Sequence, residues 1–163
     1  MRLAPAVLAL TLAVSGSIAA DPIYIDQLME TPLDALQTHF AGLKRDGCYT
    51  LPDGRFVLVN VNRGEQKAWR IAITADAPCR RPAAVRTPMD LQQRKGVAIG
   101  DSAADVVAKL GRPDAATDTD SKLRKFGDSE YFYVCRVDQE CARHTSVFMR
   151  DGLVSAIAEW YSE

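Results

Sequence analysis

The amino-acid sequence predicts an α+β fold, in which short helices (a helix–loop–helix) pack on one face of an antiparallel β-sheet. Helix-start signals precede short apolar stripes with helical spacing, and stretches of alternating apolar and polar residues follow them. This order, helix and then strands, occurs in both halves of the chain. We therefore weigh two tandem α/β units against a single domain whose halves share a core.

The first twenty residues, 1–20, have the layout of a cleavable export signal. Arg2 gives a positive start, an apolar run covers residues 6–14, and small residues precede Asp21. The apolar run is shorter than the roughly 20 residues that a membrane span needs. We expect cleavage after Ala20, a periplasmic or secreted mature chain, and no transmembrane segment in it.

Charge and cysteine content narrow the class of protein further. The 20 basic and 21 acidic residues nearly cancel, which gives no general attraction to nucleic acid, so the expected partner is another protein. Four cysteines in an exported chain predict two disulfides. The chain has no C-x-x-C motif, which is the spacing typical of zinc and redox sites. Of the three possible pairings, we favour the one that joins neighbours within each half. These pairs are Cys48–Cys79 and Cys135–Cys141.

The N-terminal unit is predicted to cover residues 21–86. Thr31-Pro32-Leu33-Asp34 is a helix start in which Thr31 caps the helix and Pro32 takes the first helical position. Gly47 is the expected end of this helix. Its apolar stripe consists of Leu33, Leu36, Phe40 and Leu43. Three strands are expected to follow, at Cys48–Leu51, Phe56–Val61 and Trp69–Thr74.

The second unit is predicted to cover residues 87–163. Thr87-Pro88-Met89-Asp90 repeats the first helix-start pattern, which leaves an internal duplication open. Ser102-Ala103-Ala104-Asp105 is a capping box, and Gly111 ends the helix that it starts. One face of this helix carries Ala103, Val106, Val107 and Leu110. Strands are expected at Lys122–Phe126, Tyr131–Val137, Thr145–Arg150 and Leu153–Tyr161.

The dipeptide Asp151-Gly152 predicts a tight hairpin and thereby a register. Met149 should face Val154, and Val147 should face Ala156. One sheet face is then apolar and is expected to lie under the helices, with Val147, Met149, Val154, Ala156, Ala158 and Trp160. The other face mixes aromatic and charged side chains and is the predicted protein-binding site, with Phe132, Phe148, Arg150, Glu159 and Tyr161. Phe132 joins it if Cys135 pairs directly across from Cys141.

Part of the second unit resembles a known family. Four features carry the resemblance: the segment Gly96–Ser102, the helix that ends at Leu110-Gly111, Pro113, and the hairpin at 147–154. Together they are similar to the SmpA/OmlA (BamE-like) pattern. The match covers about residues 95–160. It implies a helix–loop–helix on an antiparallel sheet. β-Lactamase inhibitor protein shares that fold and is similar in its two tandem units, export and two disulfides.

No catalytic pattern emerges from the sequence. His39 and His144 lack a local partner motif, no G-x-S-x-G elbow is present, and the acidic cluster at 114–120 does not fit a calcium loop. We expect no enzyme, no cofactor and no metal. The predicted function is an exported protein-binding module, such as an inhibitor or immunity-type protein acting on a periplasmic or secreted hydrolase. The alternative is a structural or outer-membrane assembly accessory of the cell envelope.

Overall fold

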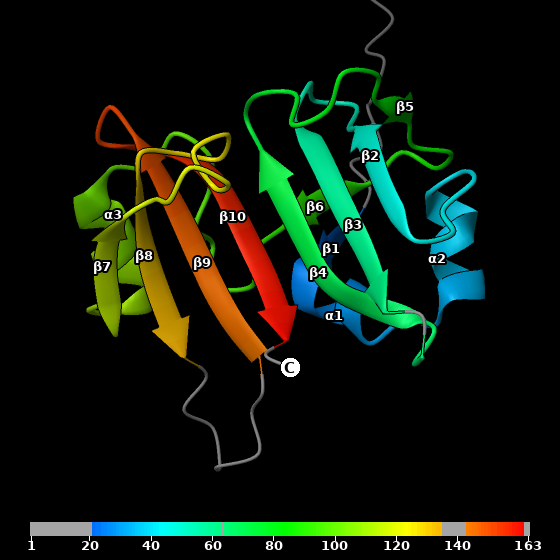
Figure 1. Ribbon diagram of the computed structural model, residues 1–163, viewed down its shortest axis with the longest axis horizontal. Helices are drawn as coiled ribbons and strands as arrows, with labels where there is room; N and C mark the ends of the chain where they lie inside the picture. The colour runs from blue at the N-terminus through cyan, green and yellow to red at the C-terminus, as the bar shows by residue number, and fades with distance from the viewer. Residues whose placement is uncertain (1–20, 63, 135–142, 162–163) are drawn as a thin grey trace, which may run out of the picture.

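The computed structural model describes residues 21–62, 64–134 and 143–161 (Figure 1). The predicted export signal and the predicted Cys135–Cys141 pair lie outside these residues. The predicted disulfide Cys48–Cys79 is confirmed, and it ties β2 to the connector that follows β4.

An eight-stranded sheet dominates the described residues, in the order β5-β2-β3-β4-β10-β9-β8-β7. Its strands are β2 (Asp46–Thr50), β3 (Phe56–Asn62), β4 (Lys67–Thr74), β5 (Ala83–Ala84), β7 (Ala115–Asp118), β8 (Ser129–Val134), β9 (Arg143–Arg150) and β10 (Leu153–Tyr161). The strands of residues 21–86 form one half of this sheet and those of residues 87–163 form the other. Antiparallel pairing of β4 with β10 joins the two halves into one continuous sheet.

The prediction of an α+β fold is wrong, because the described residues are mostly β, with 43% strand and 15% helix. The three described helices are short: α1 (Ile25–Met29), α2 (Leu33–His39) and α3 (Ala103–Leu110). The segment at 87–92 is one reason for the difference. Met89 and Leu91 are buried at a spacing of two, and this segment forms β6 (Asp90–Gln92), which pairs in parallel with β1 (Pro22–Tyr24). The helix start predicted at Thr87 is therefore wrong.

Helix α2 confirms the predicted apolar stripe but not the predicted ends. Leu36, Phe40 and Leu43 are fully buried. The residue that precedes the helix is Pro32, and the Thr31 hydroxyl donates to the carbonyl of Gln27 instead of capping the helix. The helix ends at His39, and Gly47 lies within β2.

Helix α3 confirms the predicted capping box. Ser102 Oγ accepts a hydrogen bond from the Asp105 amide at 3.2 Å, and Asp105 Oδ2 accepts one from the Ser102 amide at 2.9 Å. Gly111 ends the helix with a φ of 86°, a conformation that favours glycine. Val106 is fully buried, but Val107 is 37% exposed, so the predicted apolar face is narrower than expected.

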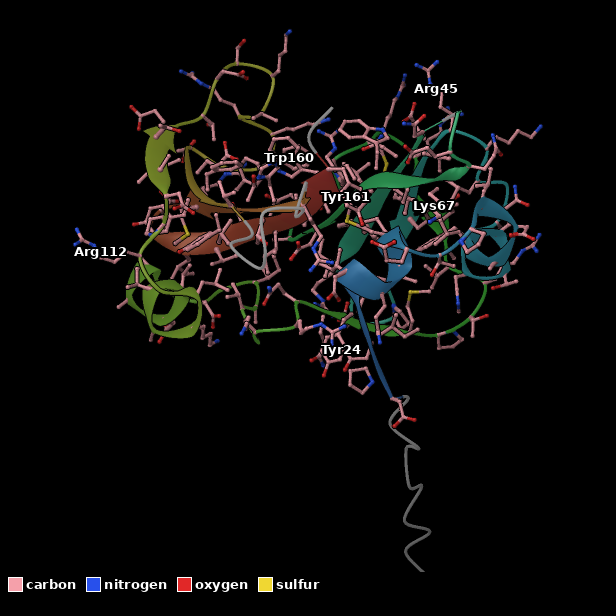
Figure 2. All side chains as sticks on the ribbon, turned by 90° about the horizontal axis from the view of Figure 1, so that it is seen from below. Tyr24, Arg45, Lys67, Arg112, Trp160 and Tyr161 are labelled. Atoms are coloured by element: carbon pink, nitrogen blue, oxygen red, sulfur yellow. A yellow bond between two sulfur atoms is a disulfide. The ribbon has the colours of Figure 1, made fainter. Side chains whose placement is uncertain are left out.

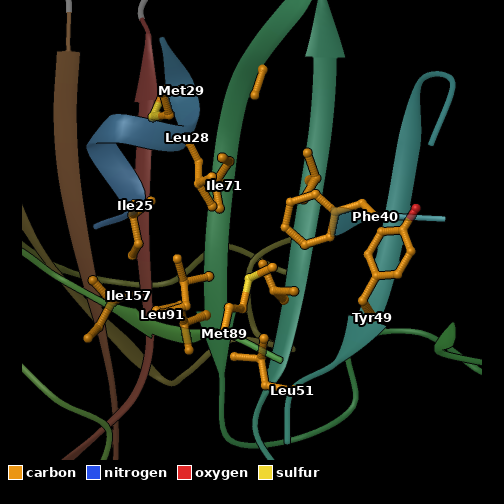
Figure 3. Close-up of a cluster of buried hydrophobic side chains, with 14 of the residues drawn as sticks. Ile25, Leu28, Met29, Phe40, Tyr49, Leu51, Ile71, Met89, Leu91 and Ile157 are labelled. Carbon is orange, nitrogen blue, oxygen red and sulfur yellow. The ribbon is translucent and has the colours of Figure 1, made fainter. Parts of the chain in front are cut away.

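The main hydrophobic core lies between the sheet and the helices, and both halves of the chain contribute to it. Helix α1, which the sequence did not predict, points Ile25, Leu28 and Met29 into it (Figure 3). Ile71 of β4 and Ile157 of β10 meet these side chains from the sheet (Figure 3). We call this side of the sheet the helix face and the opposite side the open face.

The C-terminal hairpin confirms the predicted turn but corrects the predicted faces. Asp151 and Gly152 have φ of 52° and 77°, and Met149 pairs with Val154 as expected. Beyond that pair, a bulge at Ser155 places Ala156 opposite Phe148 instead of Val147. One extra residue reverses every later side chain. The expectation that Ala156, Ala158 and Trp160 lie under the helices is therefore wrong.

The segment before β8 also differs from the prediction. Residues 122–126 form turns instead of a strand, because Asp120 Oδ1 accepts hydrogen bonds from the amides of Lys122 and Leu123. The segment with the acidic cluster, residues 114–120, contains the edge strand β7, which the sequence did not predict. Among the described helices, none is long and apolar enough to cross a membrane.

Candidate functional site

A groove crosses the open face at the seam between the two halves of the sheet. Ala72 of β4 and Ala158 of β10 are direct cross-strand partners there, and both are buried. Their methyl side chains fill little space beside the aromatic neighbours, which leaves a hollow of about 180 Å³. A cavity of about 150 Å³ accepts benzene, so this groove is large enough for one bulky side chain.

The walls of the groove are mainly aromatic. They comprise Trp69, Arg70, Leu123, Phe126, Phe148 and Trp160, with Ser146 and Glu130 at the polar positions. The indole Nε1 of Trp160 donates to Ser146 Oγ at 3.0 Å, which fixes the ring. The Trp160 ring lies 4.8 Å from His144 and 5.8 Å from Phe132, measured between centroids. Figure 2 shows Trp160 on the side of the sheet opposite to α3 and Tyr24.

Trp69 reaches the groove through a second irregularity in the sheet. The pairing of β3 with β4 shifts between Ala68 and Arg70, so Ala68 faces the core, whereas Trp69 and Arg70 both line the groove. The Arg70 guanidinium lies 4.9 Å above the Trp69 ring, and its Nε donates to Asn60 Oδ1 at 2.9 Å. Burial lowers the pKa of Arg70, whereas the nearby Asp46 raises it.

A loop of residues 119–128, which we call the covering loop, closes one side of the groove. Its Phe126 is buried against Phe148, with ring centroids 5.2 Å apart. The Ser155 hydroxyl at the bulge donates to the Phe126 carbonyl at 2.5 Å. A Cβ on Gly127 would lie 2.6 Å from the Met149 carbonyl oxygen, so glycine is required for this close approach.

Arg150, a predicted binding residue, holds the covering loop in place. Its Nη2 donates to the carbonyls of Arg124 and Lys125 at 3.2 and 3.3 Å. Its Nη1 pairs with Asp76 Oδ2 at 2.5 Å. Because these contacts engage both terminal nitrogens of its guanidinium, Arg150 positions the wall of the groove.

The predicted binding residues are only partly brought together. Phe132, Phe148 and Arg150 lie on the open face, where Phe132 contacts His144 and Trp160. The pairing of Cys135 with Cys141, on which the expectation for Phe132 depended, lies outside the described residues. Glu159 and Tyr161 lie on the helix face, because they follow the bulge at Ser155. The expectation that these two side chains share a face with Phe148 is therefore wrong.

Glu159 is buried where strands, helix α1 and the segment after β6 meet. It is 5% exposed and hydrogen-bonds with Thr145 and Gln93. Arg143 Nε lies 3.7 Å from its carboxylate, and Arg143 Nη1 lies 3.9 Å from Asp26, which also pairs with Arg94. Burial is the main cause that raises the pKa of Glu159 to about 7.

Tyr161 closes the C-terminal end of β10 against helix α1. Its hydroxyl donates to Glu30 Oε1. Burial, and then the Glu30 carboxylate, raise the pKa of Tyr161 to about 12. Both Glu159 and Tyr161 thus make internal contacts that fasten the N-terminal segment to the sheet.

Sequence reasoning missed Trp69, Arg70, Ala72, Ala158 and Trp160 as groove residues. Strict alternation places Trp69 on the same face as Ile71 and Ile73, and only the shift beside it turns the ring outward. The tryptophan content could have pointed to the groove, because the chain has two tryptophans and both line it.

Comparison with known proteins found no matching family model, no matching curated protein and no matching solved structure. The resemblance to the BamE-like family and to β-lactamase inhibitor protein therefore stays a prediction. Within the described part of the chain, no group of three or more His, Cys, Asp or Glu side chains is placed to hold a metal ion.

Proposed function

We propose that this chain is an exported module that binds another protein through the open face of its sheet. In this proposal it acts as an inhibitor or immunity-type protein on a periplasmic or secreted hydrolase. The observation that carries the proposal is the aromatic groove at the seam, with Trp69 and Trp160 in its walls. The three described helices pack against the other face and leave this one uncovered by helix.

The composition of the groove supports recognition of a protein surface. Residues that dominate binding energy at interfaces are enriched in tryptophan, tyrosine and arginine, and they cluster in well-packed pockets. Trp160 is fixed by Ser146, and Arg70 is fixed by Asn60. Side chains that are already ordered lose little conformational entropy when a partner binds, which favours affinity.

Export and the class of partner rest on separate arguments. The layout of residues 1–20 supports export, and the disulfide Cys48–Cys79 suits an oxidising compartment. The hydrolase as target rests on the resemblance to β-lactamase inhibitor protein, which is an analogy of fold and a weaker support.

The test compares three forms of the oxidised mature chain, residues 21–163, as bait for exported proteins and for candidate hydrolases. The forms are wild type, Ala158→Glu, which places a charge in the groove, and Val107→Glu, which makes the matched change on α3. Circular dichroism first establishes that all three forms are folded.

We expect wild type and Val107→Glu to retain one soluble hydrolase and to inhibit it in proportion to the complex formed, and Ala158→Glu to lose both effects. Equal retention by all three forms would reject the open face as the binding surface. Retention of outer-membrane assembly components alone would favour an accessory role in the envelope and reject the inhibitor.

A further inference from the structure

We infer that the groove receives one bulky apolar side chain of the partner protein, flanked on the partner by carboxylates. This inference rests on the proposed function and specifies the chemistry of its binding site. It follows from two separate features, the shape of the groove floor and the charges on its rim.

The floor sets the size and polarity of the guest side chain. The Ala72–Ala158 pair creates the depth, and Phe126, Phe148 and Trp160 surround it with apolar area. A hollow of about 180 Å³ accommodates a phenyl ring or a branched aliphatic side chain. A guest of this kind gains free energy from leaving water and from edge or face contacts with the aromatic walls.

The rim is cationic on both sides of the seam. On the covering loop, the two lining residues Leu123 and Phe126 are flanked by Lys122, Arg124 and Lys125. Within the described residues, none of these three side chains forms an ion pair. Asp120 and Asp128 of the same loop offset part of this charge, and Lys125 Nζ lies 5.0 Å from the centroid of the Phe126 ring. The loop therefore keeps a net positive charge beside the apolar floor.

Arg70 supplies a positive charge on the opposite wall. Among the described residues, its one hydrogen bond runs from Nε to Asn60, and its guanidinium lies over Trp69. The carboxylate of Asp46, whose charge acts on Arg70, accepts a hydrogen bond from Asn60 and pairs with Arg45. A half-buried guanidinium with free terminal donors is well suited to a carboxylate of the partner, which it can bind with two hydrogen bonds.

Glu130 is the acidic residue that lines the groove, and it limits where the carboxylates of the partner can lie. Because like charges repel, the acidic residues of the partner should approach the covering loop and Arg70 and avoid Glu130. The expected partner segment is thus a protruding loop with an apolar tip and acidic residues on either side of it.

The experiment uses short cyclic peptides that present Asp-Phe-Asp, Lys-Phe-Lys or Asp-Ala-Asp at the turn. Binding to the oxidised mature chain is followed by intrinsic fluorescence, because both tryptophans of the protein line the groove and the peptides contain none. We expect saturable binding of Asp-Phe-Asp, weakened by salt, with a Kd about thirtyfold or more below that of Asp-Ala-Asp.

Variants separate the floor from the rim. Ala158→Leu fills the hollow and should abolish the fluorescence response, while Val107→Leu on α3 should leave it unchanged. Arg70→Gln and Lys125→Gln, which keep the floor intact, should each raise the Kd for Asp-Phe-Asp by about two- to fivefold and lower its salt dependence.

Equal affinity for Asp-Phe-Asp and Lys-Phe-Lys would overturn the acidic flanks. No saturable response to either phenylalanine peptide, with every variant folded, would overturn the groove as a side-chain subsite. Neither result bears on retention of a hydrolase by the whole open face, so failure of this inference is distinguishable from failure of the proposed function.

Discussion

At the scale of single residues, burial changes the chemistry of side chains that the sequence presents as ordinary. Glu159 belongs to an alternating strand, and its neighbours in the sequence give no sign of burial. The bulge at Ser155 turns it inward toward Arg143 and the segment after β6, where loss of water disfavours its charged form. A residue predicted to bind a partner is thus an internal titratable group.

This burial predicts a pH-dependent stability that Glu159→Gln removes. The pKa of Glu159 is raised from 4.5 to about 7 in the folded protein, so the folded state binds the proton of Glu159 more tightly than the unfolded state does. The stabilisation is fully present below about pH 4.5 and is lost as the pH rises through 7. Relative to Glu159→Gln, wild type should lose about 3 kcal/mol of unfolding free energy between pH 4 and 8. Urea unfolding at several pH values measures the unfolding free energy of both proteins. The prediction is contradicted if the two plots of unfolding free energy against pH run parallel.

The close approach of the covering loop to β9 predicts that Gly127→Ala destabilises the protein. The added Cβ would meet the backbone oxygen and nitrogen of Met149, which cannot move without disturbing the strand. We expect a loss of about 1–3 kcal/mol in unfolding free energy. Gly64→Ala is the control, because its Cβ would have only one ordinary contact, with Asn62. An equal effect of both substitutions in urea unfolding would refute this account.

At the scale of elements, a sequence motif predicts a helix well when the hydrogen bonds that form the helix end lie within the motif itself. Helix α3 follows its capping box and its terminal glycine because both involve residues within one turn. At Thr87 the same type of signal fails. There the chain pairs with β1, which lies far away in the sequence. Pairing between distant strands overrides a local helix-start pattern.

Loss of the cap should therefore weaken α3 specifically. We expect Ser102→Ala to lower the unfolding free energy by about 1 kcal/mol, because the Asp105 amide loses its side-chain acceptor. Hydrogen exchange of the α3 amides should rise more than that of β3. Ser121→Ala, at an exposed turn position, serves as the control. Unchanged exchange in α3 would show that the capping bond contributes little.

At the scale of the whole molecule, the seam between β4 and β10 makes the two halves one structure. Ile71 of the first half and Ile157 of the second belong to the same hydrophobic core, as does Leu91 between them. Each half buries part of its apolar surface against the other. The groove exists for the same reason, because its floor consists of one alanine from each half.

We therefore expect the two halves to unfold in a single cooperative transition. Trp69 reports on the first half and Trp160 on the second, so Trp69→Phe and Trp160→Phe each leave one probe. For each variant, the fluorescence midpoint in urea should coincide with the midpoint from circular dichroism. Two separated transitions would show that the halves are independent domains.

Several features of the fold and the candidate site could be predicted from sequence, and the reason is their locality. These features are the apolar stripe of α2, the Asp151-Gly152 turn and the place of Phe148 on the open face. They depend on residues close together in the chain or on simple alternation. The disulfide Cys48–Cys79 followed from cysteine content and position.

Only the tertiary structure decided which side chains form the groove. The irregularities at Trp69 and Ser155 each reverse the alternation of the strand, and no local pattern announces them. Both irregularities lie in hairpins, and both strands also contact distant segments: β4 pairs with β10, and Ser155 of β10 bonds to Phe126 of the covering loop. The sequence by itself determined the ends of α3, the apolar stripe of α2 and the Asp151-Gly152 turn. The packing of one half against the other determined which faces are buried, and with them the position of the groove and the burial of Glu159.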